Sequence, residues 1–411
     1  MRRNTLIVLL LLLVMSITVA LFAHSNINVH SQSIPNTDLA STSYLYYTLK
    51  TPQGFMLARA RKGAGNQPIG TLESLVLLGN GFGQVASDSV ASMQLSPDGR
   101  YLAIDGIRDH GEQVWMYDTL HHSVTLQPAQ AMGNFLHWMP NDNGFNGHTF
   151  LYRPMFPLGP IPMDSTGWHP GLWLVDAATG AIRNINLPVP SAFLVDAAPS
   201  PDGTRIIYST SEGLGKGSDV WLMHSDGSQL THLFSVNNTV QSIAGLFAWS
   251  PDGTQVAYER LADSEVPFLP ASLWVMNSVG QFQHNLATTD GGHGYAPLWS
   301  PNGRDIAYVV RTNSSDQQAD FLAQSLQCAI GVVTVSTDTS QLIATPQQTD
   351  KMLNINPVWA TNSASVTFVA LNPINLDAGG TPRYWSADVS IGQPHPLVAP
   401  LSPTMSHIAA L

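Results

Sequence analysis

Several polar residues with the chemistry to bind a ligand lie between short apolar segments of the chain. They are Asn134, His137, Asp196, Asp290, His293 and Tyr295. Imidazole and carboxylate groups can coordinate a divalent cation, and all six side chains can hydrogen-bond a polar ligand. No His-x-His or His-x-x-x-His spacing supports a metal site among them. The same residues therefore also fit a set of polar side chains that only contact solvent.

The common catalytic patterns are missing from the sequence. Cys328 is the one cysteine, and a lone cysteine in Gln-Cys-Ala-Ile is typical of a small buried apolar residue rather than a nucleophile. The Gly-rich segment 213–217 lacks the spacing of a phosphate-binding loop, and no Gly-x-Ser-x-Gly elbow is present. We therefore predict no catalytic residue and no cofactor.

The charge balance excludes one class of partner. The 411 residues include 17 Lys and Arg against 28 Asp and Glu, which gives a net charge of −11. A nucleic-acid-binding protein needs a basic face, and so few cations over this length do not supply one. We predict no nucleic-acid partner.

A tight-turn sequence recurs about every 50 residues and organises the chain. Leu-Ser-Pro-Asp-Gly begins at Leu95, and Ser-Pro-Asp-Gly or Ser-Pro-Asn-Gly recurs after Pro199, Trp249 and Trp299. Pro presets φ at the second turn position, and Asp, Asn and Gly suit the next two, so the function predicted for these residues is structural. They are Pro97, Asp98, Gly99, Pro201, Asp202, Gly203, Pro251, Asp252, Gly253, Pro301, Asn302 and Gly303.

Each repeat has a second landmark 20 to 35 residues after its turn, a short apolar run that usually contains Trp. Nine of the ten tryptophans occupy either this landmark or the position just before the turn. Short runs rich in Val, Ile, Tyr and Trp around Gly-containing turns predict antiparallel hairpins. Four such strands per repeat predict an all-β propeller built from four-stranded antiparallel blades.

The repeat also resembles a known family. Trp-Ser-Pro-Asp-Gly followed at a short distance by Val-Ala-Tyr or Ile-Ala-Tyr, as after Trp249 and Trp299, is similar to the WD-like repeats of TolB-type β-propellers. The same repeats occur in propeller domains of prolyl-oligopeptidase and dipeptidyl-peptidase relatives. Those peptidases carry their catalytic triad on an α/β-hydrolase domain, for which this chain has no room after residue 400. The resemblance spans about residues 44–400 and implies the fold, whereas a propeller alone does not imply an activity.

Six turn-bearing units begin near residues 93, 136, 197, 247, 297 and 357. Strand-like segments within 44–78 look like strands two to four of a further unit that has no first strand. We expect seven blades, with six as the alternative. Because an open ring would leave costly strand edges, the C-terminal segment 403–411 is expected to supply the missing strand.

The N-terminus predicts export. Arg2 and Arg3 precede an uncharged run over 6–23, whose length lies between a signal-peptide core and a full membrane span. We expect residues 1–24 to form a helical signal peptide or signal anchor, 25–43 a flexible linker, and 44–411 the propeller. The positive charges ahead of the run place the propeller outside the cytoplasmic membrane, either tethered to its outer face or secreted after cleavage.

The longest insertions fall between the second and third strands of the repeats, at 153–171, 260–271, 311–329 and 371–383. These connections lie on the propeller face opposite the Ser-Pro-Asp-Gly turns, beside the channel mouth formed by the six polar residues named first. Clustered insertions favour a binding surface there, with Trp168 and His169 as candidate contacts, although loop drift would give the same pattern. The predicted function is a non-catalytic scaffold for a protein or cell-envelope polymer. The alternative is an exported hydrolase or lyase acting on a glycan or lactone at the channel mouth.

Overall fold

The computed structural model describes residues 44–409 apart from 52–53, 63–67, 78–88, 109–110, 142, 158–170, 267, 291–295, 323–324, 351–352, 372–382 and 397–404. The predicted N-terminal helix and linker, residues 1–43, lie outside the described residues.

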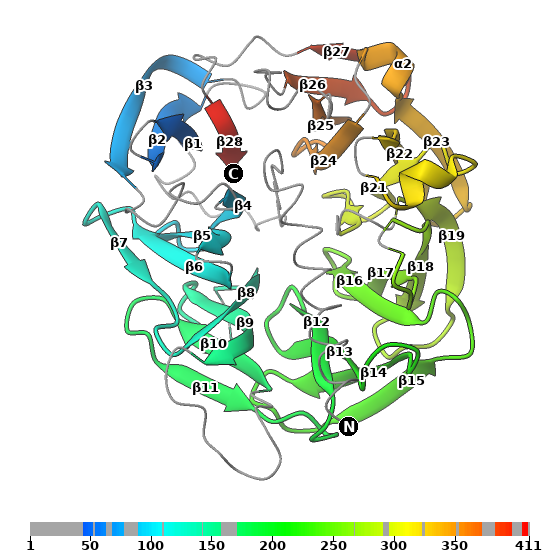
Figure 1. The fold of residues 1–411 in the computed structure, drawn as a ribbon, viewed down its shortest axis with the longest axis horizontal. Helices are drawn as coiled ribbons and strands as arrows, with labels where there is room; N and C mark the ends of the chain where they lie inside the picture. The colour runs from blue at the N-terminus through cyan, green and yellow to red at the C-terminus, as the bar shows by residue number, and fades with distance from the viewer. Residues whose placement is uncertain are drawn as a thin grey trace.

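Short antiparallel strands succeed one another around a central axis, as predicted (Figure 1). Five of the sheets have four strands each. In their hydrogen-bonding order these are β28 (Met405–Ala409), β1 (Tyr44–Thr51), β2 (Gly54–Lys62) and β3 (Pro68–Leu77); β4 (Ser89–Leu95), β5 (Tyr101–Arg108), β6 (Gly111–Asp118) and β7 (Ser123–Leu126); β8 (Ala131–Trp138), β9 (Thr149–Pro157), β10 (Leu172–Asp176) and β11 (Ile182–Ile185); β12 (Phe193–Pro199), β13 (Arg205–Ser211), β14 (Ser218–His224) and β15 (Thr231–Val236); β16 (Ile243–Trp249), β17 (Gln255–Leu261), β18 (Ala271–Asn277) and β19 (His284–Thr289).

The remaining described strands form one eight-stranded sheet. It contains β20 (Leu298–Trp299), β21 (Asp305–Arg311), β22 (Cys328–Thr334), β23 (Thr339–Ala344), β24 (Leu353–Trp359), β25 (Ser365–Leu371), β26 (Arg383–Asp388) and β27 (Pro394–Pro396). A single parallel pair, Cys328 with Leu353, joins its two antiparallel halves. The described helices are two short turns, η3 (Gln317–Asp320) and α2 (Pro346–Thr349).

The second and third strands of a blade are covered by neighbouring blades on both sides. Six of the seven residues of β22 are buried, as are five of the seven in β13. A strand that is buried on both faces needs a continuous apolar run rather than an alternating one. This explains why the repeat carries Ile-Ala-Tyr and Val-Trp-Leu runs at these positions.

The Ser-Pro-Asp-Gly turns have the structural function predicted for them. In the turn after β12, Ser200 Oγ donates to Asp202 Oδ1 at 2.5 Å, and the N–H of Thr204 donates to the same oxygen at 3.1 Å. The Gly203 N–H donates to the Ser200 carbonyl, and Gly203 has φ of 68°, a conformation that favours glycine. The carboxylate therefore fixes a turn that the backbone closes.

Tryptophans at the end of the first strands connect successive blades. The indole Nε1 of Trp249 donates to the carbonyl of Ala198 in the preceding blade at 3.2 Å. The same bond recurs from Trp138 to Gln94, from Trp299 to Ala248 and from Trp359 to Leu298. All four indoles are buried, as the sequence predicted. The tryptophans of the third strands conform in part: Trp115 and Trp173 are buried, whereas Trp221, Trp274 and Trp385 are half-buried.

The ring closes through its two ends. The C-terminal strand β28 pairs antiparallel with β1, with Tyr46 opposite Ala409 and Thr48 opposite His407. It supplies the innermost strand of the blade that β1, β2 and β3 begin. The expectation that segment 403–411 completes the N-terminal unit is thereby confirmed.

Replacing Trp249 with Ala should lower the free energy of unfolding by about 3–5 kcal/mol, because a buried aromatic ring and its interblade hydrogen bond are both lost. Trp249→Phe keeps most of the ring and loses the N–H, so it should cost less, about 1–2 kcal/mol. Urea unfolding followed by tryptophan fluorescence measures both. A loss below about 1 kcal/mol for the Ala variant would contradict this packing.

Deleting residues 401–411 should destabilise the whole ring, because β1 then loses the hydrogen bonds that it makes with β28. We expect a loss of roughly 2 kcal/mol or more, given about 1 kcal/mol for each net hydrogen bond. The matched control removes residues 410–411 only, which lie beyond β28. Equal unfolding midpoints for the two deletions would show that the strand does not close the ring.

Candidate functional site

Two of the predicted channel-mouth residues lie on β8 and one on the neighbouring β12. Arg153 of β9 connects these two strands. It donates through Nη2 to Asn134 Oδ1 at 2.6 Å and through Nη1 to the carbonyl of Val195 at 2.7 Å. The positive charge of Arg153 also acts on Asp196. Asn134, Arg153 and Asp196 thus form a small polar group between two adjacent first strands.

The titrations of Asp196 and His137 reflect desolvation. Burial raises the pKa of Asp196 above its ordinary value, while the backbone N–H groups of Phe247 and Ala197 oppose that shift. The Phe247 N–H donates to Asp196 Oδ2 at 2.9 Å, where the pairing of β16 with β17 is interrupted by a bulge. Burial lowers the pKa of His137 to about 4, so its imidazole is neutral at pH 7. Through its hydrogen bond with the Phe247 N–H, Asp196 connects its own blade to the next one.

Asp290 lies elsewhere, between the blade of β19 and the eight-stranded sheet. Its backbone N–H donates to the Val309 carbonyl, and the Cys328 thiol lies 3.9 Å from its Oδ2. Burial first, and then the charge of Asp290, raise the pKa of the Cys328 thiol well above its ordinary value. Cys328 is therefore an unreactive thiol at neutral pH, in agreement with the sequence analysis.

A second carboxyl group, Glu259 of β17, acts on the same buried region. Burial, and secondly the charge of Asp290, raise the pKa of Glu259 well above its ordinary value. Both residues are almost fully buried. Two carboxylates this deep repel each other, so ionisation of Glu259 is disfavoured in the folded protein. Sequence analysis missed Glu259, because a single acid within a strand gives no pattern.

The remaining predicted contacts lie outside the described residues. These are His293 and Tyr295 at the channel mouth, and Trp168 and His169 in the insertion after β9. Over the described ranges, no three His, Cys, Asp or Glu side chains come together in an arrangement that could hold a metal ion. The structure joins Asn134 to Asp196 through Arg153 and places Asp290 in a different interface.

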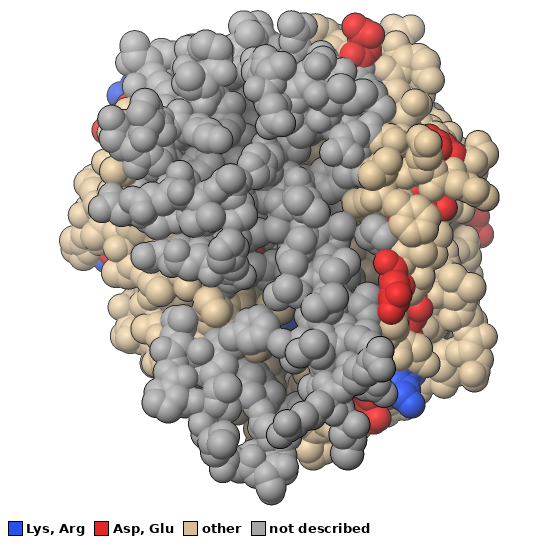
Figure 2. Space-filling view, in the orientation of Figure 1, with Lys and Arg blue, Asp and Glu red and all other residues tan. Residues whose placement is uncertain are grey.

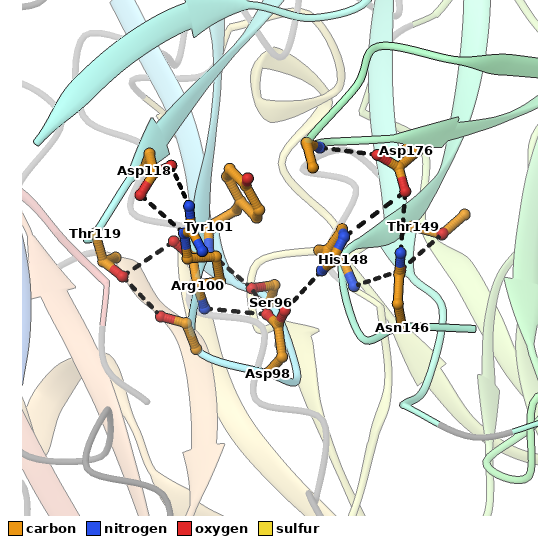
Figure 3. Close-up of polar contacts among 12 residues, drawn as sticks. Ser96, Asp98, Arg100, Tyr101, Asp118, Thr119, Asn146, His148, Thr149 and Asp176 are labelled. Carbon is orange, nitrogen blue, oxygen red and sulfur yellow. Dashed lines mark hydrogen bonds and ion pairs between the residues drawn. The ribbon is translucent and has the colours of Figure 1, made fainter. Parts of the chain in front are cut away.

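On the turn face, one polar network joins two blades (Figure 3). His148, just before β9, approaches Asp98 Oδ2 through Nδ1 at 2.7 Å and Asp176 Oδ2 through Nε2 at 3.7 Å. Asn146 also donates to Asp176 Oδ2. The first oxygen of Asp98 is occupied by its own turn, through Ser96 and Arg100. Asp98 therefore fixes its turn and holds the next blade, a second function that the repeat alone did not indicate.

On the opposite face, the insertion between β21 and β22 is fixed by one buried arginine. The Arg311 side chain is 0% exposed and donates through Nη1 to Asp320 Oδ1 and to the Phe268 carbonyl, both at 2.7 Å. Its Nη2 donates to the Asp316 carbonyl at 2.8 Å. Asn313 closes the base of the insertion by donating to the Ser325 carbonyl.

Hydrogen bonds continue from this insertion into the loops of two preceding blades. The Phe268 N–H donates to the Asp320 carbonyl at 3.1 Å, and the Asp263 N–H donates to the Val240 carbonyl at 2.9 Å. Gln241 donates through Nε2 to the Pro270 carbonyl at 2.9 Å. We call this connected surface the insertion platform. It comprises the described residues 236–242, 262–266, 268–270, 312–322 and 325–327.

The outer side of the insertion platform carries large apolar side chains. Phe321 is 61% exposed and Leu322 is 49% exposed, while Ala319 and Leu326 of the same insertion are fully buried in the core. Val240 is 69% exposed on the loop two blades earlier. The sequence indicated this insertion by its length, but the anchoring function of Arg311 depends on backbone carbonyls that no motif reveals.

Comparison with known proteins supports the fold. No protein-family model matches the chain. The chain is 28% identical over 120 residues to the Tol-Pal system protein TolB of Alcanivorax borkumensis. This match spans 27% of the chain and 24% of TolB, so about a quarter of each protein is compared. The predicted resemblance to TolB-like propellers is confirmed.

Solved structures of low sequence identity have the same fold. An oligogalacturonate lyase in complex with manganese superposes with a TM-score of 0.55 at 15% identity, covering 89% of each chain. The oligogalacturonate lyase of Vibrio parahaemolyticus gives 0.52 at 14% identity, covering 89% of this chain and 97% of its own. At these identities the likeness concerns the fold alone.

The helices of the described segments are short, and none is long and apolar enough to cross a membrane. The apolar run predicted to do so, residues 6–23, lies outside those segments.

Glu259 gives a prediction for the pH dependence of stability. Its pKa is raised in the folded state, so above the ordinary value of about 4.3 the unfolded chain ionises first and unfolding is favoured. The stability of the wild type should therefore decrease as pH rises from about 4 toward the folded pKa, by about 1.4 kcal/mol per unit of pKa difference.

The isosteric Glu259→Gln variant lacks this contribution. It should be more stable than the wild type at pH 7–8, and the difference should shrink as the pH approaches 4. Urea titrations at several pH values measure it. A stability difference that is independent of pH would show that the pKa of Glu259 is the same in the folded and the unfolded chain.

Proposed function

We propose that this chain is an exported propeller that binds a protein or a cell-envelope polymer through the face opposite its Ser-Pro-Asp-Gly turns. The observation that carries the proposal is the insertion platform, in which hydrogen bonds connect the loops of successive blades and large apolar side chains stay exposed. Loops held on a rigid scaffold are a common location for binding residues.

The opposite face supports this division, because its turns use their polar groups internally. Asp252 accepts from Ser250 Oγ at 2.6 Å and from the Thr254 N–H at 3.1 Å. Asp202 has the same partners in its own turn, and the second oxygen of Asp98 is occupied by His148. Carboxylates engaged in this way stabilise the blades and offer little to a ligand.

We also infer that the ring has seven blades. In the eight-stranded sheet, β20–β23 and β24–β27 each follow the antiparallel order of a single blade. The one parallel pair between Cys328 and Leu353 is a contact between neighbouring blades. Separating the two halves adds two blades to the five four-stranded sheets.

A further part of the proposal concerns location. The uncharged run 6–23 behind Arg2 and Arg3 favours export, with the propeller tethered to the outer face of the membrane or released by cleavage. The similarity to a Tol-Pal system protein is in keeping with a location in the cell envelope. A periplasmic-only reporter fused after Ser43 should be active, and the same fusion lacking residues 1–24 should be inactive. Activity of both fusions would refute export through this segment.

The division into two faces is tested with two variants and cell-envelope extract. Deleting the insertion 158–170 should abolish retention of the partner by the immobilised protein without lowering stability. Asp252→Ala removes three hydrogen bonds of its turn and should cost about 1–2 kcal/mol while leaving partner affinity unchanged. If both variants changed stability and binding alike, the assignment of separate structural and binding faces would be wrong.

The alternative function is an exported hydrolase or lyase that acts on a glycan or lactone. The structural likeness to oligogalacturonate lyases concerns the fold and so does not select it. Incubating the purified full chain with oligogalacturonate and with a sugar lactone tests this alternative directly. Turnover of either compound by the purified chain would favour the enzyme over the scaffold.

A further inference from the structure

We infer that the insertion platform binds a protein segment in which an apolar side chain is flanked by Lys or Arg, and does not bind an anionic polymer. This inference rests on the proposed function and specifies the partner of the same face. Three features of the described residues carry it: a fixed frame, exposed apolar side chains and an unbalanced negative charge.

The frame is fixed before a partner arrives. Arg311 donates to groups in both the 312–327 insertion and the 262–270 loop, and its side chain is fully buried. Asp316 caps η3 by accepting from the Gln318 N–H at 3.0 Å. A surface that is already ordered loses little conformational entropy on binding, so its contacts contribute more fully to affinity.

The exposed apolar side chains offer an anchor site of modest size. Phe321 and Leu322 are adjacent in the chain and follow directly on η3. The two side chains together suit insertion of one apolar residue of a partner rather than a large hydrophobic interface. Additional affinity must then come from the polar surroundings.

Those surroundings are acidic. The platform contains four carboxylates, Asp263, Glu265, Asp316 and Asp320, and no Lys, Arg or His within its own residues. The neighbouring 212–217 loop, whose Gly217 N–H donates to Asp263 Oδ2, adds one exposed charge of each sign, Glu212 and Lys216. The adjoining Arg311 neutralises one of the four carboxylates, because it pairs with Asp320. In the face drawn in Figure 2, Asp and Glu side chains lie along the right-hand part, over β16–β23 of Figure 1, where Lys and Arg are sparse.

The negative charge of the platform favours a basic peptide over an anionic polymer as the partner. A polyanion would meet like charges at distances within the Debye length of about 8 Å at physiological salt, and the chain as a whole carries −11. A Lys- or Arg-bearing segment is attracted by the same field, which speeds association and fixes its orientation. The occupant that fits both the apolar pair and the carboxylates is therefore a basic peptide with an apolar anchor.

The test uses the full chain and three defined probes. These are a fluorescent twelve-residue peptide of alternating Leu and Lys, the same peptide with Glu in place of Lys, and polygalacturonate. Fluorescence anisotropy measures binding of the two peptides, and competition against the Leu/Lys peptide measures binding of the polymer. We expect the Leu/Lys peptide to bind, with an affinity that falls at least tenfold between 50 and 300 mM salt, and the two anionic probes not to bind.

Two platform variants and two controls locate the binding. Phe321→Ser removes the apolar anchor and Glu265→Lys reverses an exposed charge. Each variant should lower the affinity for the Leu/Lys peptide at least fivefold. Phe282→Ser changes a side chain that is 81% exposed in the turn between β18 and β19, and Asp226→Lys reverses a charge in the turn between β14 and β15. Both controls lie on the turn face and should leave affinity within twofold.

Equal weakening by the control variants, binding of either anionic probe with comparable affinity, or no binding of the Leu/Lys peptide would overturn the inference. The proposed function and the proposed partner chemistry can be refuted independently. If deletion of 158–170 still abolishes binding of the envelope partner while the Leu/Lys peptide does not bind, the binding face stands and only the partner chemistry is wrong.

Discussion

The hydrogen bond from a tryptophan indole to the backbone of the preceding blade is the interaction on which the ring depends. It occurs four times with donor–acceptor distances of 2.9–3.2 Å, and each acceptor directly precedes the corresponding position of the earlier blade. Each bond therefore sets the rotation between two blades while the ring of the same indole fills the space between them. Because the donor is buried, leaving it unpaired would be costly, so this geometry is strongly selected over a displaced one.

The blade of β12 has Pro199 where other blades have the tryptophan, so its contact with the preceding blade lacks the indole N–H donor. Proline has no side-chain N–H, so the joint between β8 and β12 uses Arg153, which donates to Val195 across the same interface. Asp196, the residue after Val195 on β12, accepts from the N–H of Phe247 in the next blade. Asn134, which accepts from the same Arg153, and Asp196 suggested a ligand site from their chemistry, and both belong to the contacts that hold neighbouring blades in place.

Local patterns made most of the fold predictable, and the side-chain site was much less so. The Ser-Pro-Asp-Gly turns depend on residues two positions apart, such as Ser200 and Asp202, so a repeat in the sequence suffices to find them. Closure by 403–411 followed from the missing first strand. Arg311 and Glu259 could not be found in this way, because their partners lie in other blades or in backbone carbonyls. Which blade interface Asp290 occupies could not be predicted for the same reason, since position around the ring depends on blade packing.

The two faces also differ in how far apart in the sequence their hydrogen-bonding partners lie. On the turn face the acids bind first within their own turns, and Asp98 in addition contacts His148 of the next blade. The repeat keeps the same turn residues from blade to blade. On the insertion face the contacts run between loops, as from Asp320 to Phe268 and from Val240 to Asp263. A frame of backbone carbonyls and N–H groups constrains few side chains, so the outward residues are free to be chosen for a partner. Phe321 and Leu322 stay exposed on this frame, as Phe282 does on the turn face, so the proposed binding surface rests on their position among the platform carboxylates rather than on exposure alone.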